Sequence, residues 1–257
     1  METRLTIQGL RAFADNYIWV LRHKGNAVVV DPGDAAPVLE HLRSSGDRLS
    51  AILITHHHLD HMGGVSELAE HFKVPVFGPG KEAIPGLTHR LSGGEKIEVP
   101  GIDVHFDVLD VGGHTRGHIA YYHPKVLFCG DALFVLGCGR LFEGTPEQMS
   151  RSLARIAALP RDTKVYCAHE YAKNNLPFAL AVEPGSASLQ KRAALLRQAI
   201  AAGQPTVPML LGDELDTNPF LRCDVVEVIA AARNFRGHAL TNPVDIFAAL
   251  REWRNQL

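Results

Sequence analysis

The stretch Ile54–His61, ITHHHLDH, places four histidines and one aspartate within eight residues, directly after an apolar run. In an extended segment, residues i and i+2 point the same way. His56 and His58 can therefore converge on one metal ion, while His57 points elsewhere. The alternative is a solvated polar loop, which suits any single histidine better than it suits the whole string.

Asp60 and His61 follow where the chain turns toward a helix, so they can serve a second ion beside the first. Neutral imidazole and carboxylate suit zinc, iron or manganese. A solvated polar loop does not explain why several imidazole and carboxylate side chains are crowded into the same space. The spacing therefore favours a metal site at the end of a strand.

The composition of the whole chain limits the classes of function. With 257 residues, the chain can form one large domain, or one domain with a small companion. The formal net charge of -2 argues against nucleic acid as a bulk electrostatic partner. The first ten residues, METRLTIQGL, lack the pattern of a secretory signal, and no apolar run is long enough to span a bilayer. We expect a cytoplasmic protein without a membrane partner.

The four cysteines are widely spaced and form no CxxC pair. This spacing is typical of reduced, structural thiols and not of a disulfide framework or a cysteine-rich zinc site. The cysteines are Cys129, Cys138, Cys167 and Cys223.

Two regions of different composition follow one another along the chain. As far as His169, short β-rich runs alternate with helical patterns at Pro37–Ser45, Val65–Phe72 and Thr145–Leu159. The third helix has the strongest signals, because Thr145 can cap it and Gln148 completes a capping box. After Tyr171, helices are predicted in residues 186–203, 224–233 and 243–257, with no strands between them. We place a domain boundary near residue 173.

Three further polar residues share the context of the histidine cluster, since each lies at the end of an apolar strand. They are His114, Asp131 and His169. Strand ends of one sheet share a rim, so these residues can meet the cluster there. Asp131 is the natural bridge, because its carboxylate can hold one ion with each oxygen. One ion would then bind His56, His58 and His114, and the other Asp60, His61 and His169.

The motifs that carry these residues resemble a known family. THHHLDH, GGHTRGH, FCGDALF and CAHEY are similar to the ligand motifs of the metallo-β-lactamase superfamily, in the same order. FADNYIWVL, GCGRLFEGTPEQM, AHEYAKNNLPFA and TNPFLR narrow the resemblance to the hydroxyacylglutathione hydrolase (glyoxalase II) family. The resemblance covers nearly the whole chain. It implies an α+β fold, a four-layer αββα sandwich with a C-terminal helical domain.

The resemblance also implies an activity and a separate role for each domain. Residues 1–173 would form the catalytic domain, and residues 174–257 a helical domain that binds glutathione. The enzyme would hydrolyse S-(2-hydroxyacyl)glutathione, typically S-D-lactoylglutathione, to glutathione and D-lactate, the second step of methylglyoxal detoxification. Two divalent ions, with zinc preferred over iron or manganese, would supply a metal-bound hydroxide that Asp60 and Asp131 orient. A monomer is expected.

Five residues are implied to bind the substrate. Arg140 and Phe142 stand where the family often has Lys and Tyr, so one hydroxyl contact is lost. Tyr171 is the last residue of the CAHEY motif, two residues after His169. Arg251 and Arg254 lie on one face of the final helix, where the family holds the glycine carboxylate of glutathione. From the local pattern alone, these two arginines fit a solvated basic face better than a substrate site, because basic residues are favoured near a helix C-terminus in any case.

Other residues are given supporting roles. We expect His118 to lie outside the ligand set, Asp31 to brace the metal loop by hydrogen bonds, and Cys138 to be a small packed residue. Gly112-Gly113 replaces the Thr-Pro common in the family, which should alter only a turn.

Two other classes of function fit the same ligands. One is a glutathione persulfide dioxygenase, which uses a single iron and dispenses with the second ion. The other is a non-catalytic metal-binding protein, which thioester turnover would exclude.

Overall fold

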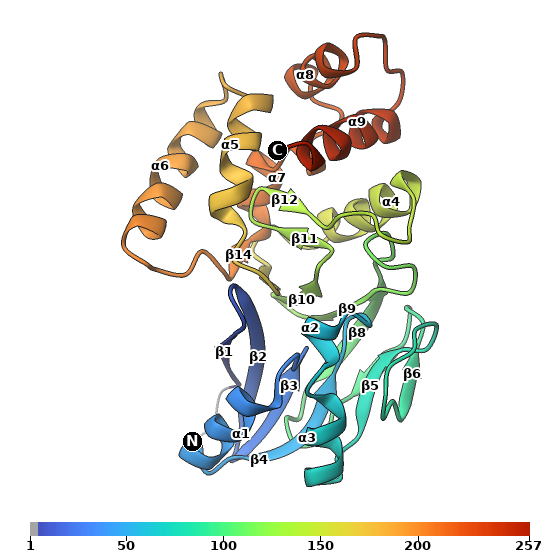
Figure 1. Cartoon of the computed structure of the whole chain (residues 1–257), viewed down its shortest axis with the longest axis vertical. Helices are drawn as coiled ribbons and strands as arrows, with labels where there is room; N and C mark the ends of the chain where they lie inside the picture. The colour runs from blue at the N-terminus through green and yellow to red at the C-terminus, as the bar shows by residue number, and fades with distance from the viewer. Residues whose placement is uncertain (1–4) are drawn as a thin grey trace. The chain divides into compact units, whose positions relative to one another are not determined.

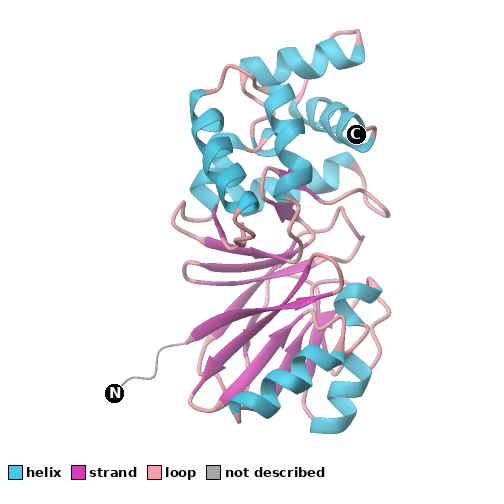
Figure 2. Cartoon of the chain, turned by 60° about the vertical axis from the view of Figure 1, so that its left-hand side comes forward, coloured by secondary structure: helices cyan, strands magenta, loops and turns pink. Residues whose placement is uncertain are grey.

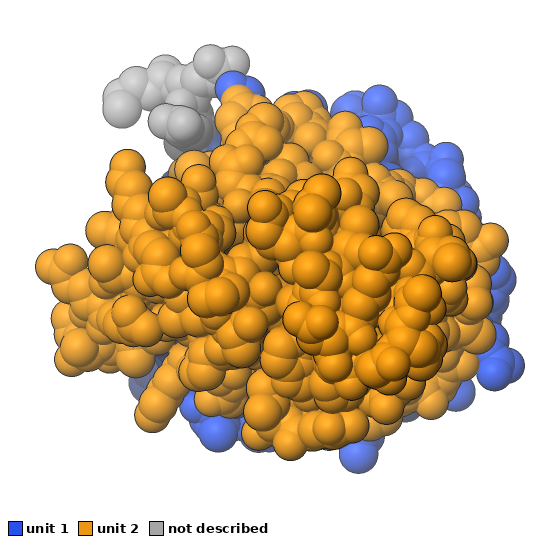
Figure 3. All heavy atoms as spheres, turned by 90° about the horizontal axis from the view of Figure 1, so that it is seen from above, with its two compact units in different colours: residues 1–110, 115–130 blue, residues 111–114, 131–257 orange. Residues whose placement is uncertain are grey.

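The computed structural model describes residues 5–257 and divides them into two compact units (Figure 3). Unit 1 contains residues 5–110 and 115–130, and unit 2 contains residues 111–114 and 131–257. Mixed sheets packed with helices, followed by a C-terminal helical region, confirm the α+β class. The two units are groups of residues that pack closely among themselves, and their boundaries differ from the predicted boundary near residue 173. That boundary remains a prediction about functional domains.

The first sheet of unit 1 places the loops after three of its strands at the same edge. Its strands lie in the order β1-β2-β3-β4-β5-β6, antiparallel from β1 to β3 and parallel from β3 to β6 (Figure 1). The carboxyl ends of parallel strands share an edge, so the loops after β3, β4 and β5 come together there. The strands are β1 (Thr6–Ala12), β2 (Asn16–His23), β3 (Asn26–Val30), β4 (Arg48–Leu53), β5 (Val76–Pro79) and β6 (His89–Leu91).

Helices α1 (Ala35–Ser45) and α3 (Val65–Phe72) pack on one face of this sheet (Figure 2). Val38 of α1 and Leu68 of α3 are fully buried in the same core as Val29 and Ile52 of the strands. Both helices were predicted, and α1 begins two residues earlier than expected because Asp34 caps it. The short helix α2 (Leu59–Met62) lies between the metal motif and α3.

A second sheet in unit 1 faces the first. It contains β7 (Lys96–Glu98), β8 (His105–Asp110), β9 (Ile119–His123) and β10 (Val126–Gly130), in the antiparallel order β10-β9-β8-β7. The Tyr121 hydroxyl donates to the carbonyls of Ile54 (2.8 Å) and Phe77 (3.2 Å), which belong to the first sheet and the residue that follows it. Burial raises the pKa of Tyr121 well above its usual range, so this donor stays protonated. Unit 1 thus contains three of the predicted layers.

Unit 2 contains the helical region and two pairs of short strands. The predicted capping box at Thr145 is present, and α6 is capped by Ser186 at its start and ends shortly before Gly203. The elements are β11 (Leu133–Phe134), β12 (Gly137–Cys138), α4 (Pro146–Ala157), β13 (Lys164–Cys167), α5 (Ala172–Val182), α6 (Ala187–Ala201), β14 (Met209–Leu210), α7 (Leu211–Thr217), the 3-10 helix η1 (Pro219–Leu221), α8 (Val226–Arg236) and α9 (Pro243–Asn255).

The expectation of no strand after Tyr171 was wrong at one place. Strand β14 pairs antiparallel with β13, with Met209 opposite Val165. Its two residues are too few to show the alternation by which strands are recognised. The helical region has an aromatic core in which Phe178 stacks on Phe220, with ring centroids 5.5 Å apart. Among the described residues, no cysteine forms a disulfide and no helix is long and apolar enough to cross a membrane.

Candidate metal centre

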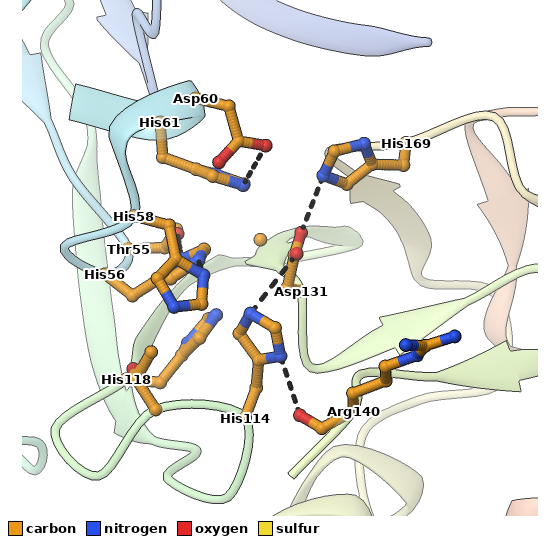
Figure 4. A network of polar contacts seen from close by, with 12 residues as sticks. Thr55, His56, His58, Asp60, His61, His114, His118, Asp131, Arg140 and His169 are labelled. Atoms are coloured by element: carbon orange, nitrogen blue, oxygen red, sulfur yellow. Dashed lines mark hydrogen bonds and ion pairs between the residues drawn. The ribbon is translucent and has the colours of Figure 1, made fainter. Parts of the chain in front are cut away.

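The loop after β4 brings two imidazoles together in unit 1. His56 Nε2 lies 3.1 Å from His58 Nδ1, and His56 is fully buried (Figure 4). Two nitrogens bound to one tetrahedral zinc lie about 3.3 Å apart, given bonds of about 2.0–2.1 Å. His57 points away from this pair, with its Nδ1 2.9 Å from the Glu82 carboxylate. The orientation of all three rings agrees with the i, i+2 argument.

Asp60 and His61 form a second pair of donors in the same unit. His61 Nε2 lies 3.5 Å from Asp60 Oδ2 (Figure 4). Asn16 at the start of β2 donates from Nδ2 to the same carboxylate oxygen at 2.9 Å, which fixes its position. Gly33 passes so close that a Cβ there would lie 1.9 Å from the Asp60 carbonyl oxygen. The turn after β3 therefore requires glycine to let α2 approach.

Asp31 braces this loop, as expected, and binds three of its groups. Its buried carboxylate accepts from the Thr55 amide (2.8 Å) and the Thr55 hydroxyl (2.7 Å), and lies 3.1 Å from His61 Nδ1. A histidine that donates through Nδ1 presents Nε2 without a proton to a metal. Asp31 therefore selects the tautomer of His61 that can act as a ligand.

Glu82, in the loop after β5, is a central residue of the site that no sequence motif indicated. Its Oε2 accepts from the His57 amide at 2.7 Å. Its Oε1 accepts from the Thr115 hydroxyl (2.6 Å) and the Gly117 amide (2.9 Å). The carboxylate thus ties the histidine loop to the loop before β9. A lone glutamate among turn residues carries no spacing signal, so only the folded chain shows this role.

His118 lies outside the donor pairs, as predicted. Its ring stacks on that of His56, with centroids 4.5 Å apart and an interplanar angle of 17°. Its Nδ1 lies 3.1 Å from the Ile119 carbonyl oxygen. Together these contacts fix the plane of the His56 ring.

In unit 2, Asp131 directly follows β10 and stands between two imidazoles. Its Oδ2 lies 3.4 Å from His114 Nε2, and its Oδ1 lies 3.4 Å from His169 Nε2 (Figure 4). Each carboxylate oxygen thus faces a different histidine. All three residues are more than nine-tenths buried. This arrangement is what a carboxylate shared by two ions requires.

The backbone of the segment after β12 orients His114. His114 Nδ1 lies 2.8 Å from the Arg140 carbonyl oxygen, which leaves Nε2 toward Asp131 (Figure 4). A Cβ on Gly139 would lie 2.9 Å from the same Nδ1, so the close approach requires glycine. Gly113 has φ 148°, and a Cβ there would lie 2.7 Å from that of Met149. Gly113 therefore sets the packing of α4 as well as a turn.

Aromatic rings surround His169. The ring of Tyr171 stacks on it, with centroids 4.7 Å apart, and Phe134 contacts Tyr171 edge-on at 4.9 Å. Phe142 is 64% exposed, and its ring lies 5.3 Å from that of His114. Of the residues implied to bind substrate, Tyr171 and Phe142 are thus adjacent to histidines of this cluster.

The three implied arginines differ in exposure but share one electrostatic environment. Arg251 is 6% exposed, Arg254 is partly buried and Arg140 is exposed. Burial lowers the pKa of Arg254, and the positive charges of Arg251 and Arg140 lower it further. Within residues 5–257, none of the three forms an ion pair with a carboxylate. A cationic cluster without an acidic partner favours an anionic ligand.

The donors form two clusters, one in unit 1 (His56, His58, Asp60 and His61) and one in unit 2 (His114, Asp131 and His169). The chemistry of both clusters fits divalent metal ions. Both clusters combine imidazole with carboxylate, and the facing donor atoms lie 3.1–3.5 Å apart. Such separations are those of ligands around a common ion. Bracing groups fix the tautomers of His61 and His114, as metal-binding histidines require.

Comparisons with known proteins agree with this chemistry. Residues 13–169 match the family model described as "Metallo-beta-lactamase superfamily", and residues 170–257 match "Hydroxyacylglutathione hydrolase C-terminus". A hydroxyacylglutathione hydrolase of Dechloromonas aromatica (strain RCB) is 54% identical, over 98% of this chain and 99% of that protein.

Two solved structures have the same fold. The crystal structure of ETHE1 from Myxococcus xanthus aligns with a TM-score of 0.67 and 24% identity, over 97% of this chain and 98% of that one. The crystal structure of TTHA1623 in a di-iron-bound form aligns with a TM-score of 0.53 and 30% identity, over 62% of this chain and 90% of that one.

Proposed function

The chain belongs to the hydroxyacylglutathione hydrolase family of the metallo-β-lactamase superfamily, and on that premise we propose that it hydrolyses S-(2-hydroxyacyl)glutathione to glutathione and a 2-hydroxy acid. S-D-lactoylglutathione is the expected substrate. The observation that carries the mechanism is the placement of Asp131, whose two oxygens each face a different imidazole. A carboxylate so placed supports a site for two ions.

The proposed metal centre uses all seven donors of the two clusters. One ion is assigned His56, His58 and His114, and the other Asp60, His61 and His169, with Asp131 shared. Zinc is the preferred ion, with iron or manganese as alternatives, because all three suit imidazole and carboxylate. When bound, a pair of such ions lowers the pKa of water and polarises the thioester carbonyl.

The protein groups prepare this chemistry by fixing the donors. Asn16 holds the Asp60 carboxylate, while Asp31 and the Arg140 carbonyl set the tautomers of His61 and His114. We assign Asp60 and Asp131 the further role of orienting the attacking water. The leaving thiolate needs no general acid, because a free thiol has a pKa of only about 8.5.

The arginine cluster is proposed to bind the peptide part of the substrate. A glutathione thioester carries two carboxylates, and Arg140, Arg251 and Arg254 offer positive charge that no carboxylate among residues 5–257 pairs with. Tyr171 and Phe142 are proposed to contact the substrate near the histidines. Phe142 lacks the hydroxyl that the family often has there, so it can offer apolar contact only.

The domain assignment and the setting of the reaction are part of the same proposal. Residues 1–173 would supply catalysis and residues 174–257 the binding of glutathione. We propose a monomer that acts in the cytoplasm, where glutathione is a principal thiol. The single-iron persulfide dioxygenase is not favoured, because it dispenses with the second ion while Asp60, His61 and His169 are all present here.

The proposal is tested by turnover of purified, metal-loaded protein. We expect S-D-lactoylglutathione to be hydrolysed with a kcat/KM within the usual range of enzymes, about 10⁴–10⁸ M⁻¹s⁻¹. Glutathione persulfide, tested on the same sample with oxygen present, should not be turned over. Consumption of oxygen with the persulfide and no thioester hydrolysis would replace the proposed function with the dioxygenase.

A further inference from the structure

The turn of hairpin β11–β12 is buried in unit 2. Its two-residue loop consists of Val135 and Leu136, and both side chains are fully buried. Leu136 has φ 55°, a left-handed conformation that leucine rarely adopts and that two-residue hairpin loops usually give to glycine or asparagine. A buried backbone amide also needs an acceptor. The turn therefore depends on contacts from other parts of the fold.

Glu214 of α7 is the acceptor for this turn. Its Oε2 accepts from the Leu136 amide and from Asn218 Nδ2, each at 2.9 Å, and its Oε1 accepts from Arg192 Nη2. Glu214 is fully buried. All three partners are donors, and a carboxylate is the side chain that can accept from them through both of its oxygens.

The partners of the carboxylate extend the network to the rest of the hairpin and to α6. Asn218 Nδ2 lies 3.0 Å from the Gly137 carbonyl oxygen and 3.3 Å from that of Phe134, one on each strand. Arg192 of α6 donates from Nη1 to the Thr217 hydroxyl at 2.6 Å. A buried ion pair adds little net stability, because desolvation of the two charges offsets their attraction. Its value here is that it fixes where the hairpin lies against α6 and α7.

Both ends of this hairpin lead to the metal-site donors of unit 2. Asp131 lies two residues before β11, and the Arg140 carbonyl that orients His114 lies two residues after β12. The ring of Phe134, within the hairpin, lies 5.9 Å from that of His169. A displacement of the hairpin would therefore disturb all three donors.

We propose that Glu214, held by Arg192, is a positioning residue for the metal centre, which it serves by fixing the turn of hairpin β11–β12. The proposal rests on the proposed function, because it takes the donors of unit 2 as metal ligands. It gives the C-terminal helical region, to which substrate binding is assigned, a second role in the construction of the metal centre.

Glu214→Gln tests this role, because glutamine has nearly the same shape but replaces one acceptor oxygen with a donor. Whichever way its amide turns, an N–H group faces another donor. Loss of groups that orient metal ligands costs about 10–100-fold, and Glu214 acts one step further away, so we expect kcat to fall about tenfold. The KM for lactoylglutathione should change by less than about twofold, and a small thioester without the peptide should show the same fall in kcat. Metal affinity, measured by competition with a chelator, should fall about tenfold.

Glu183→Gln is the matched control for loss of a buried ion pair. Glu183 is also buried, and its carboxylate accepts from Arg222 Nε at 2.8 Å and Arg222 Nη2 at 2.9 Å, not from the hairpin. This variant should lower the melting temperature, while kcat and metal affinity should stay within about twofold of the parent protein because the hairpin keeps its partners.

Hydrogen exchange provides a readout that does not depend on activity. With metal in excess, the amides of residues 133–142 should exchange faster in Glu214→Gln than in the parent protein. In Glu183→Gln, the same amides should show no selective change. The comparison separates a local release of the hairpin from a general loss of stability.

The results also separate this inference from the proposed function. If Glu214→Gln lowers only the melting temperature, with kcat, metal affinity and exchange of residues 133–142 unchanged, Glu214 is merely structural and the inference fails. A raised KM with unchanged kcat would place Glu214 in substrate binding and also overturn it. If the parent protein does not hydrolyse lactoylglutathione, the proposed function fails, while metal affinity and exchange still test the role of Glu214.

Arg192→Lys keeps the inference testable if Glu214→Gln does not fold. Lysine retains a cation beside Glu214 but loses the planar fork that donates to both Glu214 and Thr217. Selectively faster exchange of residues 133–142 is again expected, with a smaller size. Exchange equal to that of the parent protein would overturn the inference.

Discussion

Replacement of Asp131 with alanine is expected to reduce thioester turnover by more than about 100-fold and to lower the metal content of the purified protein. Loss of a group that merely orients a metal ligand costs up to about 100-fold in affinity or activity, and Asp131 is proposed to bind both ions. Its oxygens face His114 and His169 at 3.4 Å each, so its removal affects both ions at once. Metal analysis and steady-state kinetics on the same sample measure the two effects.

His57→Ala is the matched control within the histidine string. His57 turns its ring to Glu82, and the backbone amide that Glu82 accepts from remains in the variant. Metal content should stay near that of the parent protein, and turnover should fall far less than in Asp131→Ala. Equal losses of metal in the two variants would show that the assignment of faces in residues 56–58 is wrong.

The second large effect is expected from Asp31→Asn, which changes one atom beneath the metal site. Asparagine tolerates the left-handed φ of 53° at this position, so the turn should persist. Its amide nitrogen, however, would donate where Asp31 Oδ2 now accepts from Thr55 and faces His61 Nδ1. The variant therefore favours the His61 tautomer with the proton on Nε2, which cannot bind metal. We expect metal affinity to fall about 10–100-fold, measured by competition with a chelator.

Asp34→Asn controls for charge removal in the same loop. Asp34 caps α1 by accepting a hydrogen bond from the Ala36 amide, and asparagine caps helices equally well. This variant should keep its metal affinity and its melting temperature. If Asp34→Asn lost as much metal as Asp31→Asn, the effect would come from the net charge of the loop and not from the tautomer of His61.

Local sequence pattern predicted much of the fold and the candidate donors. The helix over Val65–Phe72 and the capping box at Thr145 depend on residues within one turn, so a single window contains their signals. His56 and His58 point to the same side because side chains two residues apart do so in an extended chain. The strand-end position of Asp131 likewise needed only an apolar run followed by a carboxylate.

The bracing residues could not be predicted in this way, because their partners are distant in sequence. Glu82 binds the loops of His57 and Thr115 only after three separate segments have met. Asn16 reaches Asp60 across 44 residues. The spacing of Arg251 and Arg254 showed that they share a helix face. It did not show that Arg251 donates a hydrogen bond to the carbonyl of Cys138, 113 residues away. Such roles depend on tertiary contacts that no local window records.

The most direct test of the central claim is a metal titration of the metal-free protein with thioester turnover recorded at each step. Seven donors are too many for one tetrahedral ion, so we predict that full activity with S-D-lactoylglutathione requires about two ions per chain. Activity should remain low while the first ion binds and should rise to its maximum as the second binds. Full turnover at one ion per chain, with no further gain on adding more metal, would contradict the binuclear mechanism.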